Sequence, residues 1–425
     1  MYVRSLKIEN LRCFERATMD LQFPGREQEA PPELPNVNLL LGNNGAGKTT
    51  VLKAIALGVL ELSPLSSGFN PINLVRRKRD VRKAEVRVDQ VFHPEDNAVA
   101  PDDLLGVTVT VTKVKDSEIL GPLMRLNERD RVMTIDELFE SPSPASLLVG
   151  YGSTRADASQ FEPVMSQQKH RVLRYQRVAG LFEEFIRLIP LSSWLPRLQI
   201  VDASRVEEVA QLLNDLLPRE SRFLGEVENG EYLFMHCGIP VPLSALSDGY
   251  RAYIGWVSDL LCNISLGAPK GSRLRDARGV VLVDEIDLHL HPEWQREVVP
   301  TVARALPNLQ FVLTTHSPIV AGTLSAKNIF VLEMDGAGAS TIRQLTEPIH
   351  GLNADQILVS SYFGLKTSRA QSAEDKLRQL SRRAMSGDSG AALEFLKKLT
   401  TGTETPPAKP KPSAASAARP RRKAR

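Results

Sequence analysis

Cysteine is scarce in this chain of 425 residues. Only Cys13, Cys237 and Cys262 occur, and they lie far apart. An odd number of widely spaced cysteines argues against a disulfide framework and gives no cysteine pair at the spacing of a metal site. The chain also has no run of about 18 apolar residues, and residues 1–4 lack the apolar core of a signal peptide. These absences predict a cytoplasmic protein with reduced thiols and no membrane partner.

A large excess of one charge is absent as well. The net charge is +3, from 53 basic and 50 acidic residues, but residues 401–425 alone have a balance of +6. The first 400 residues therefore sum to −3, so any nucleic-acid affinity must come from the tail or from local patches. The tail is rich in Pro, Ala, Lys and Arg, which predicts a disordered segment. We expect the tail either to bind nucleic acid non-specifically or only to keep the chain soluble.

The most specific pattern is a complete G-x-x-x-x-G-K-[ST] sequence, Gly42-Asn43-Asn44-Gly45-Ala46-Gly47-Lys48-Thr49. An apolar run precedes it and a helix-forming stretch from Thr50 follows it, which is the strand–loop–helix context that this motif requires. The glycines allow backbone N–H groups to close around phosphate oxygens at a helix N-terminus. We expect Gly42 to Thr50 to bind ATP. Lys48 would reach the β- and γ-phosphates, and the Thr49 hydroxyl would bind Mg²⁺.

Two carboxylates end an apolar stretch further along the chain. Residues 279–283 are followed directly by Asp284 and Glu285. An unbroken apolar run suits a central parallel strand, and ligands in such sheets bind outside the carboxyl ends of the strands. We therefore expect Asp284 to share the Mg²⁺ with Thr49, and Glu285 to act as the base that polarises the attacking water.

Two further patterns point to the γ-phosphate. Residues 311–315 form an apolar strand that ends at His316, which we expect to sense the phosphate or orient the water. Ser247-Asp248-Gly249 precedes an amphipathic stretch and makes a second phosphate cradle. Because one chain needs only one cradle for its γ-phosphate, this second one is expected to complete the site of another copy. Simple helix capping by Ser247 is the alternative.

These motifs resemble the Walker A, signature, Walker B and switch-histidine motifs of ABC-type ATPases. Residues 6–14 and 284–292 are similar to the SMC, RecF and OLD branch, and residues 351–358 resemble antiphage-defence ATPases such as the PtuA subunit of Septu systems. The resemblance covers about residues 1–400. It implies an α/β P-loop NTPase fold of the ABC/SMC-head type. This fold has a mixed central sheet with an antiparallel β lobe, here joined by a compact helical lobe and a C-terminal helical piece.

The resemblance also implies a homodimer or higher oligomer closed around ATP, in which Ser247, Asp248 and Gly249 contact the γ-phosphate held by another protomer. Arg12 is expected to contact phosphate by resemblance alone. Arg155 either touches nucleotide or partner or forms a structural salt bridge. The chain departs from the family twice: Asp248 replaces the usual second glycine of the signature, and residues 156–243 replace a long coiled coil.

Five segments are predicted along the chain. Residues 1–155 and 244–345 form the two halves of the ATPase head, and residues 156–243 form the helical lobe between them. Residues 346–400 form the C-terminal helical piece and 401–425 the tail. Apolar spacing predicts a helix over residues 178–189, and Ser204 with Glu207 predicts a capping box at the start of a second helix.

The favoured function is an ATPase that regulates a separate effector, such as a nuclease in antiphage defence. The residues after His316 contain no Asp-x-Asp or His-Asn-His nuclease pattern, so no nuclease activity is expected in this chain. The alternatives are a DNA repair or recombination mediator and a transporter ATPase subunit. The wide spacing of Lys48, Ser247 and Asp284 argues against the transporter.

Two remaining patterns have competing interpretations. The basic stretch from Arg76 to Lys83 either contacts DNA or RNA through phosphates or is a solvated face. His289 and His291 have the spacing of a metal pair, but no cysteine or carboxylate cluster accompanies them. We expect them in a loop at the dimer seam.

Overall fold

The computed structural model describes residues 1–60, 72–92, 104–115, 117–121, 124–127, 147–153, 173–183, 186–268, 271–367 and 371–401. The chain divides into two compact units, Met1–Gly364 and Leu365–Arg425. None of the helices in the described ranges combines the length and the apolarity that a bilayer crossing needs.

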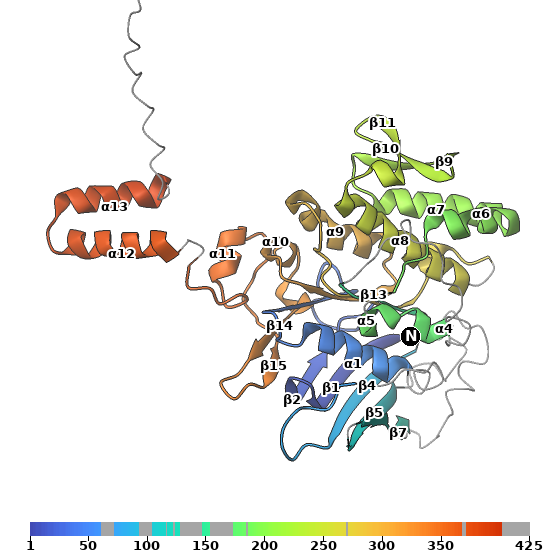
Figure 1. Ribbon diagram of the computed structural model, residues 1–425, viewed down its shortest axis with the longest axis horizontal. Helices are drawn as coiled ribbons and strands as arrows, with labels where there is room; N and C mark the ends of the chain where they lie inside the picture. Colours follow the sequence, from blue (N-terminus) through green and yellow to red (C-terminus); the bar gives the residue numbers. More distant parts are fainter. Residues whose placement is uncertain are drawn as a thin grey trace, which may run out of the picture. The chain divides into compact units, whose positions relative to one another are not determined.

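The first unit is built around one large sheet (Figure 1). Its described strands follow the order β6-β5-β4-β1-β2-β15-β14-β3-β13-β12-β8, with β7 paired to β5. Strands β8, β12, β13, β3 and β14 are parallel, whereas β1, β2, β4, β5, β6 and β7 form an antiparallel lobe. The predicted mixed sheet is therefore confirmed. The strand bounds are β1 Tyr2–Leu11, β2 Phe14–Asp20, β3 Val37–Gly42, β4 Lys83–Val91, β5 Leu104–Val114, β6 Ser117–Leu120, β7 Met124–Asn127, β8 Leu147–Tyr151, β12 Gly279–Val283, β13 Leu309–Thr315, β14 Ile329–Met334 and β15 Ser340–Arg343.

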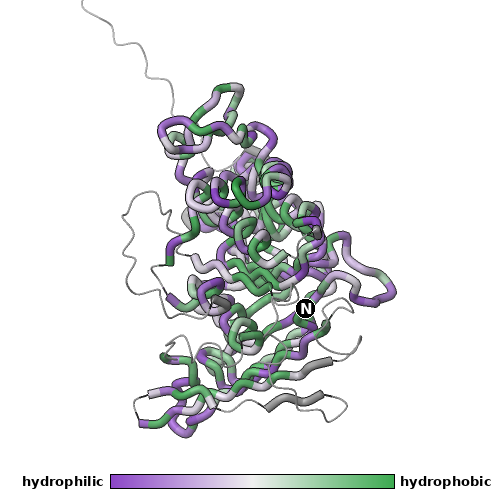
Figure 2. Tube along the Cα trace, turned by 90° about the vertical axis from the view of Figure 1, so that its right-hand side faces the viewer, coloured by the Kyte–Doolittle hydropathy of each residue, from purple (hydrophilic) through white to green (hydrophobic). Residues whose placement is uncertain are grey.

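The parallel strands are buried on both faces, which explains their unbroken apolar sequences. Because side chains alternate along a strand, β12 serves two cores. Val281 and Val283 pack in one core with helices α8 (Asp248–Gly267) and α9 (Pro292–Ala305). Val280 and Leu282 pack in the other with helix α1 (Lys48–Leu60). Figure 2 shows hydrophobic stretches of the backbone trace gathered in the interior, where strands and helices pack together.

Between β8 and α8 the chain forms a lobe that we define as residues 191–242. It consists of helix α6 (Leu191–Val201), helix α7 (Ala203–Leu216) and a small antiparallel sheet. The sheet strands are β9 (Ser221–Glu228), β10 (Glu231–His236) and β11 (Ile239–Pro242), and only helices were predicted in this region. The short helices α4 (Leu173–Gln176) and α5 (Ala179–Phe182) precede the lobe.

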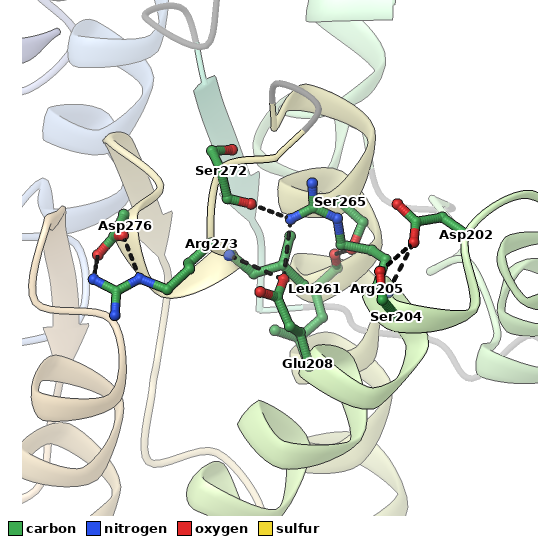
Figure 3. Close-up of polar contacts among 10 residues, drawn as sticks. Asp202, Ser204, Arg205, Glu208, Leu261, Ser265, Ser272, Arg273 and Asp276 are labelled. Carbon is green, nitrogen blue, oxygen red and sulfur yellow. Dashed lines mark hydrogen bonds and ion pairs between the residues drawn. The ribbon is translucent and has the colours of Figure 1, made fainter.

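Helix α7 is tied to the segment that leads into β12 (Figure 3). Nη1 of the buried Arg205 donates to Glu208 Oε2 at 3.0 Å and to the carbonyl oxygen of Ser272 at 2.5 Å. The predicted capping box of Ser204 and Glu207 is wrong. Asp202 caps the helix instead, because its carboxylate accepts hydrogen bonds from Arg205 N at 3.1 Å and from the Ser204 hydroxyl at 2.6 Å. An acidic N-cap also interacts favourably with the helix dipole.

The predicted continuous helix over residues 178–189 is also wrong. Helix α5 ends at Phe182, and the described residues from Ile186 to Pro190 are not helical. The backbone N–H of Ile189 donates to Asp259 Oδ1 on α8 at 2.8 Å. The Tyr151 hydroxyl donates to the other oxygen of the same buried carboxylate at 2.8 Å. A buried acidic side chain needs hydrogen-bond partners, so this tertiary contact overrides the local helical spacing.

The described part of the second unit is a pair of helices, α12 (Gln371–Met385) and α13 (Ser389–Thr401). Asp388 joins them, since it accepts a hydrogen bond from Ala391 N at 2.9 Å and pairs with Arg383 at 2.6 Å. Helices α10 (Pro318–Ala321) and α11 (Ala354–Val359) belong to the first unit. The predicted tail lies outside the described residues, apart from Thr401 at the end of α13, and the five predicted segment boundaries stay predictions.

Candidate active site

The phosphate-binding loop joins β3 to the N-terminus of α1. Gly47 has φ +102°, and a Cβ atom there would lie 2.6 Å from Cys13 Sγ and 2.7 Å from the Phe14 ring. A Cβ atom on Gly42 would lie 2.5 Å from the carbonyl oxygen of Leu332. Glycine is therefore required at both positions by the close approach of β14 and of the β1–β2 turn.

Lys48 is held at the base of this loop. Its Nζ donates to the carbonyl oxygens of Gly42 at 2.8 Å and Asn43 at 3.3 Å, and it lies 2.7 Å from His316 Nε2. Burial lowers the pKa of Lys48, although Asp284 and Glu285 oppose this shift. Burial and the neighbouring ammonium both lower the pKa of His316. Since Lys48 can only donate, His316 is a neutral acceptor at this nitrogen.

Asp284 lies beside the loop at the end of β12 and is 4% exposed. The Thr49 hydroxyl donates to Asp284 Oδ2 at 2.6 Å, and the Thr314 hydroxyl donates to Oδ1 at 2.6 Å. Mg²⁺ prefers hard oxygen ligands and keeps several waters. The Thr49 hydroxyl and the Asp284 carboxylate therefore fit this ion, and their joint binding of Mg²⁺ stays a prediction.

Glu285 follows in a backbone conformation that side chains rarely adopt, with φ +50°. Its N–H donates to the Thr314 hydroxyl oxygen at 2.7 Å, and the next N–H, of Ile286, donates to the Thr314 carbonyl oxygen at 2.9 Å. A non-glycine residue in the left-handed region often marks a functional position. Thr314 thus hydrogen-bonds both Asp284 and Glu285. Sequence reasoning missed this role because a threonine inside an apolar strand belongs to no recognisable motif.

These side chains converge on one cavity of about 450 Å³. Three neighbouring strands supply the loop, the carboxylates and the histidine, as the order β3-β13-β12 requires. The lining also includes Arg12, whose contact with phosphate stays a prediction, and Cys13, which sequence reasoning did not select. The lining residues are Arg12, Cys13, Asn44, Gly45, Gly47, Lys48, Thr49, Thr50, Asp284, Glu285 and His316. Arg155 lies outside the described residues.

The signature turn, Ser247-Asp248-Gly249, is not among the residues that line this cavity. Ser247 is the N-cap of α8, but its exposed hydroxyl makes no capping hydrogen bond, so the capping alternative has no support. Asp248 forms an ion pair with Arg251. A Cβ atom on Gly249 would lie 2.3 Å from the carbonyl oxygen of His289, so the turn packs against the loop that follows β12.

The loop after β12 is anchored from the strand that carries His316. The Thr315 hydroxyl, at the end of β13, donates to Asp287 Oδ1 in this loop at 2.5 Å, and the Ser317 hydroxyl, at the N-cap of α10, donates to Gln295 Oε1 on α9 at 2.6 Å. His289 and His291 lie in this loop region, and the described residues contain no cluster of three or more potential metal-ligating side chains.

Comparison with known proteins places these features in a family. Residues 5–215 match the model of an "AAA domain", and residues 152–321 match that of "AAA domain, putative AbiEii toxin, Type IV TA system". The chain is similar to the "Retron Ec83 probable ATPase" of Escherichia coli, with 40% identity over 396 residues, 78% of this chain and 71% of that protein.

The chain is also similar to the "Septu protein PtuA" of Bacillus mycoides, with 27% identity over 369 residues, 86% of this chain. The match spans only 45% of that protein's length. Among solved structures, the SMC head bound to the C-winged helix domain of ScpA superposes with a TM-score of 0.51 at 16% identity. That match covers 81% of this chain and 98% of the other, and it establishes the fold alone. The chain therefore belongs to the family of ATPases that includes the retron Ec83 "probable ATPase".

Proposed function

We propose that this chain binds ATP with Mg²⁺, dimerises around it and hydrolyses it, and thereby controls a separate effector protein in antiphage defence. One observation carries the proposal. Lys48 and Thr49 of the phosphate loop, the carboxylates of Asp284 and Glu285, and His316 line a single cavity although they come from three strands far apart in the sequence. Phosphoryl transfer to water requires this combination of cation, acidic groups and polar orienting groups.

Each side chain has a specific task in this mechanism. The loop N–H groups and the Lys48 ammonium bind phosphate oxygens and stabilise the negative charge that develops during transfer. Bound Mg²⁺, held by Thr49 and Asp284, would supply further charge neutralisation. The Glu285 carboxylate accepts a proton from the attacking water. The neutral His316 accepts a hydrogen bond at Nε2 and so orients the groups around the γ-phosphate.

The dimer is proposed because the signature turn does not line the cavity of its own chain. Ser247 is exposed and its hydroxyl caps nothing, so it is free to donate to a phosphate held by a second copy. The N-terminus of the 20-residue helix α8 adds partial positive charge at the same point. In such a dimer the signature turn of each copy would face the nucleotide cavity of the other copy.

The effector is proposed to be a different protein. The relatives are named after retron and Septu systems, and the sequence resemblance described above associates the Septu ATPases with antiphage defence. A nuclease is the effector class that we favour, and this chain is proposed to have no nuclease activity of its own. It would transmit its nucleotide state to that partner through dimerisation.

The proposal is tested with purified chain by measuring phosphate release from ATP with and without Mg²⁺. We expect Mg²⁺-dependent turnover that is lost in Lys48→Ala and retained in Lys7→Ala, an exposed lysine on β1. Turnover that survives in Lys48→Ala would exclude this cavity as the catalytic site. The dimer is tested separately, by sedimentation with and without ATP.

A further inference from the structure

The residue directly after the signature turn is part of an aromatic cluster. The Tyr250 ring lies 4.3 Å from the ring of Trp294 on α9 and 4.7 Å, edge-on, from His236 on β10. Trp294 in turn contacts Tyr253 at 5.1 Å. The first turn of α8 is therefore packed against both α9 and the small sheet of the lobe, not against the nucleotide cavity.

A single carboxylate of the lobe fixes the orientation of this cluster. Glu220, immediately before β9, accepts from the Tyr250 hydroxyl at 2.6 Å and from Trp294 Nε1 at 3.1 Å, both on Oε1. Burial acts to raise the pKa of Glu220, but the hydrogen bonds from Tyr250, from the Glu220 backbone N–H and from Trp294, together with His236, outweigh it, so the pKa is lowered. The carboxylate is thus ionised at neutral pH and both bonds are charge-assisted.

Glu220 is itself held by the lobe. Its carbonyl oxygen accepts from Cys237 N at 3.0 Å. The hydroxyl of its neighbour Ser221 lies 2.9 Å from His236 Nδ1. Backbone hydrogen bonds of the small sheet therefore fix the position of Glu220. Its carboxylate bridges helices α8 and α9, which flank the central sheet.

We infer that Glu220 is a positioning residue for ATP hydrolysis, which holds the signature turn in the orientation that a second copy's nucleotide requires. The inference rests on the proposed ATP-bound dimer. Gly249 already confines the turn on one side, because there is no room for a Cβ atom against His289. Glu220 confines it further through the next residue, because the Tyr250 hydroxyl donates to the Glu220 carboxylate. Neither Glu220 nor Tyr250 lines the nucleotide cavity, so their loss affects closure of the dimer and not nucleotide binding by the single chain.

The experiment compares Glu220→Ala, Glu220→Gln and Tyr250→Phe in the full chain. The glutamine keeps an acceptor oxygen, and the phenylalanine keeps the ring but removes the donor. Glu226→Ala, on the exposed part of β9, is the matched control. Turnover at saturating ATP, affinity of the isolated chain for a fluorescent ATP analogue and ATP-dependent dimerisation are measured, with thermal unfolding as a check on folding.

We expect Glu220→Ala and Tyr250→Phe to lower turnover and dimerisation by about tenfold, with nucleotide affinity unchanged within about twofold. Glu220→Gln should recover most of the activity, and Glu226→Ala should match the unmodified chain. Unchanged turnover in Glu220→Ala would overturn the inference, and so would a parallel loss of nucleotide affinity. If the unmodified chain neither hydrolyses ATP nor dimerises, the proposed function fails instead, so the two failures are distinguishable.

Discussion

Lys48 Nζ and His316 Nε2 lie 2.7 Å apart, although 268 positions separate the two residues. The strands that bring them together, β3 and β13, are neighbours in the sheet. A protonated imidazole could not accept this hydrogen bond and would place two positive charges side by side. The contact therefore exists only with a neutral histidine.

The first prediction concerns pH. The pKa of His316 is lowered from 6.5, first by burial and then by Lys48. Below about pH 6.5 the unfolded chain binds a proton at this position that the folded chain does not, so stability falls as the pH falls towards the lowered pKa. Thermal unfolding of the nucleotide-free chain should show this loss between roughly pH 8 and pH 5. The dependence of the free energy of unfolding on pH should be weaker in His316→Gln. An equal slope in that variant, with His291→Gln as control, would contradict the prediction.

The second prediction concerns Glu285→Gln. The glutamine is isosteric but cannot accept a proton, so turnover should fall by about 10²–10⁴-fold. ATP binding should persist, because the loop and Asp284 are unchanged. A closed, ATP-loaded dimer should then accumulate and be seen by size-exclusion chromatography with light scattering. Glu297→Gln, on the exposed face of α9, is the control. Turnover at the unmodified rate would remove Glu285 from the mechanism.

The third prediction concerns Thr314, which hydrogen-bonds Asp284 at 2.6 Å and Glu285 N at 2.7 Å. Thr314→Val keeps the shape but leaves a buried carboxylate oxygen and a backbone N–H without this partner. Such a loss costs about 1–3 kcal/mol, so kcat should fall by roughly one to two orders of magnitude. Thr314→Ser restores the hydroxyl and should recover turnover. Equal defects in the serine and valine variants would show that packing, not the hydroxyl, matters.

The fourth prediction separates backbone strain from close contact in the loop. Gly45 and Gly47 both have positive φ, but only at Gly47 would a Cβ atom meet other groups, 2.6 Å from Cys13 Sγ. Gly45→Ala should therefore lower ATP affinity only through strain of about 1–3 kcal/mol. Gly47→Ala should lower it further, because Phe14 and Cys13 must move. Calorimetric titration with ATP measures both. Equal losses in the two variants would argue against the contact.

Most features that depend on residues close together in the sequence could be predicted, and most features that depend on tertiary contacts could not. The phosphate loop and the fold class were predicted because the loop is a local pattern and buried parallel strands have unbroken apolar runs. The convergence of Lys48, Asp284 and His316 followed from strand ends sharing one edge of a sheet. The capping box failed for a local reason, because Asp202 caps α7 in place of Ser204, whereas the predicted helix over residues 178–189 failed for a tertiary reason. Residues 186–190 leave the helical path because Asp259, 70 positions away from Ile189, takes its N–H.

Other features had no local signal at all. Cys13 joins the cavity only because the β1–β2 turn packs on Gly47, and Thr314 is an ordinary strand residue until its neighbours are known. Glu220 looks like a surface carboxylate in sequence. Its two donors, Tyr250 and Trp294, come from separate helices, and no spacing rule connects them. Such contacts arise from the assembled fold and not from periodicity.

The central place of β3 has a consequence for synthesis. This strand lies between β13 and β14, which begin at Leu309 and Ile329, so the first 300 residues contain neither of its neighbours. A nascent chain on the ribosome can form the local helix α1 early, but it closes the sheet around the phosphate loop only after β14 has emerged. Long-range parallel pairing of this kind is slow. The phosphate loop is thus synthesised before both of the strands that flank β3, and it gains its place in the sheet only once they have formed.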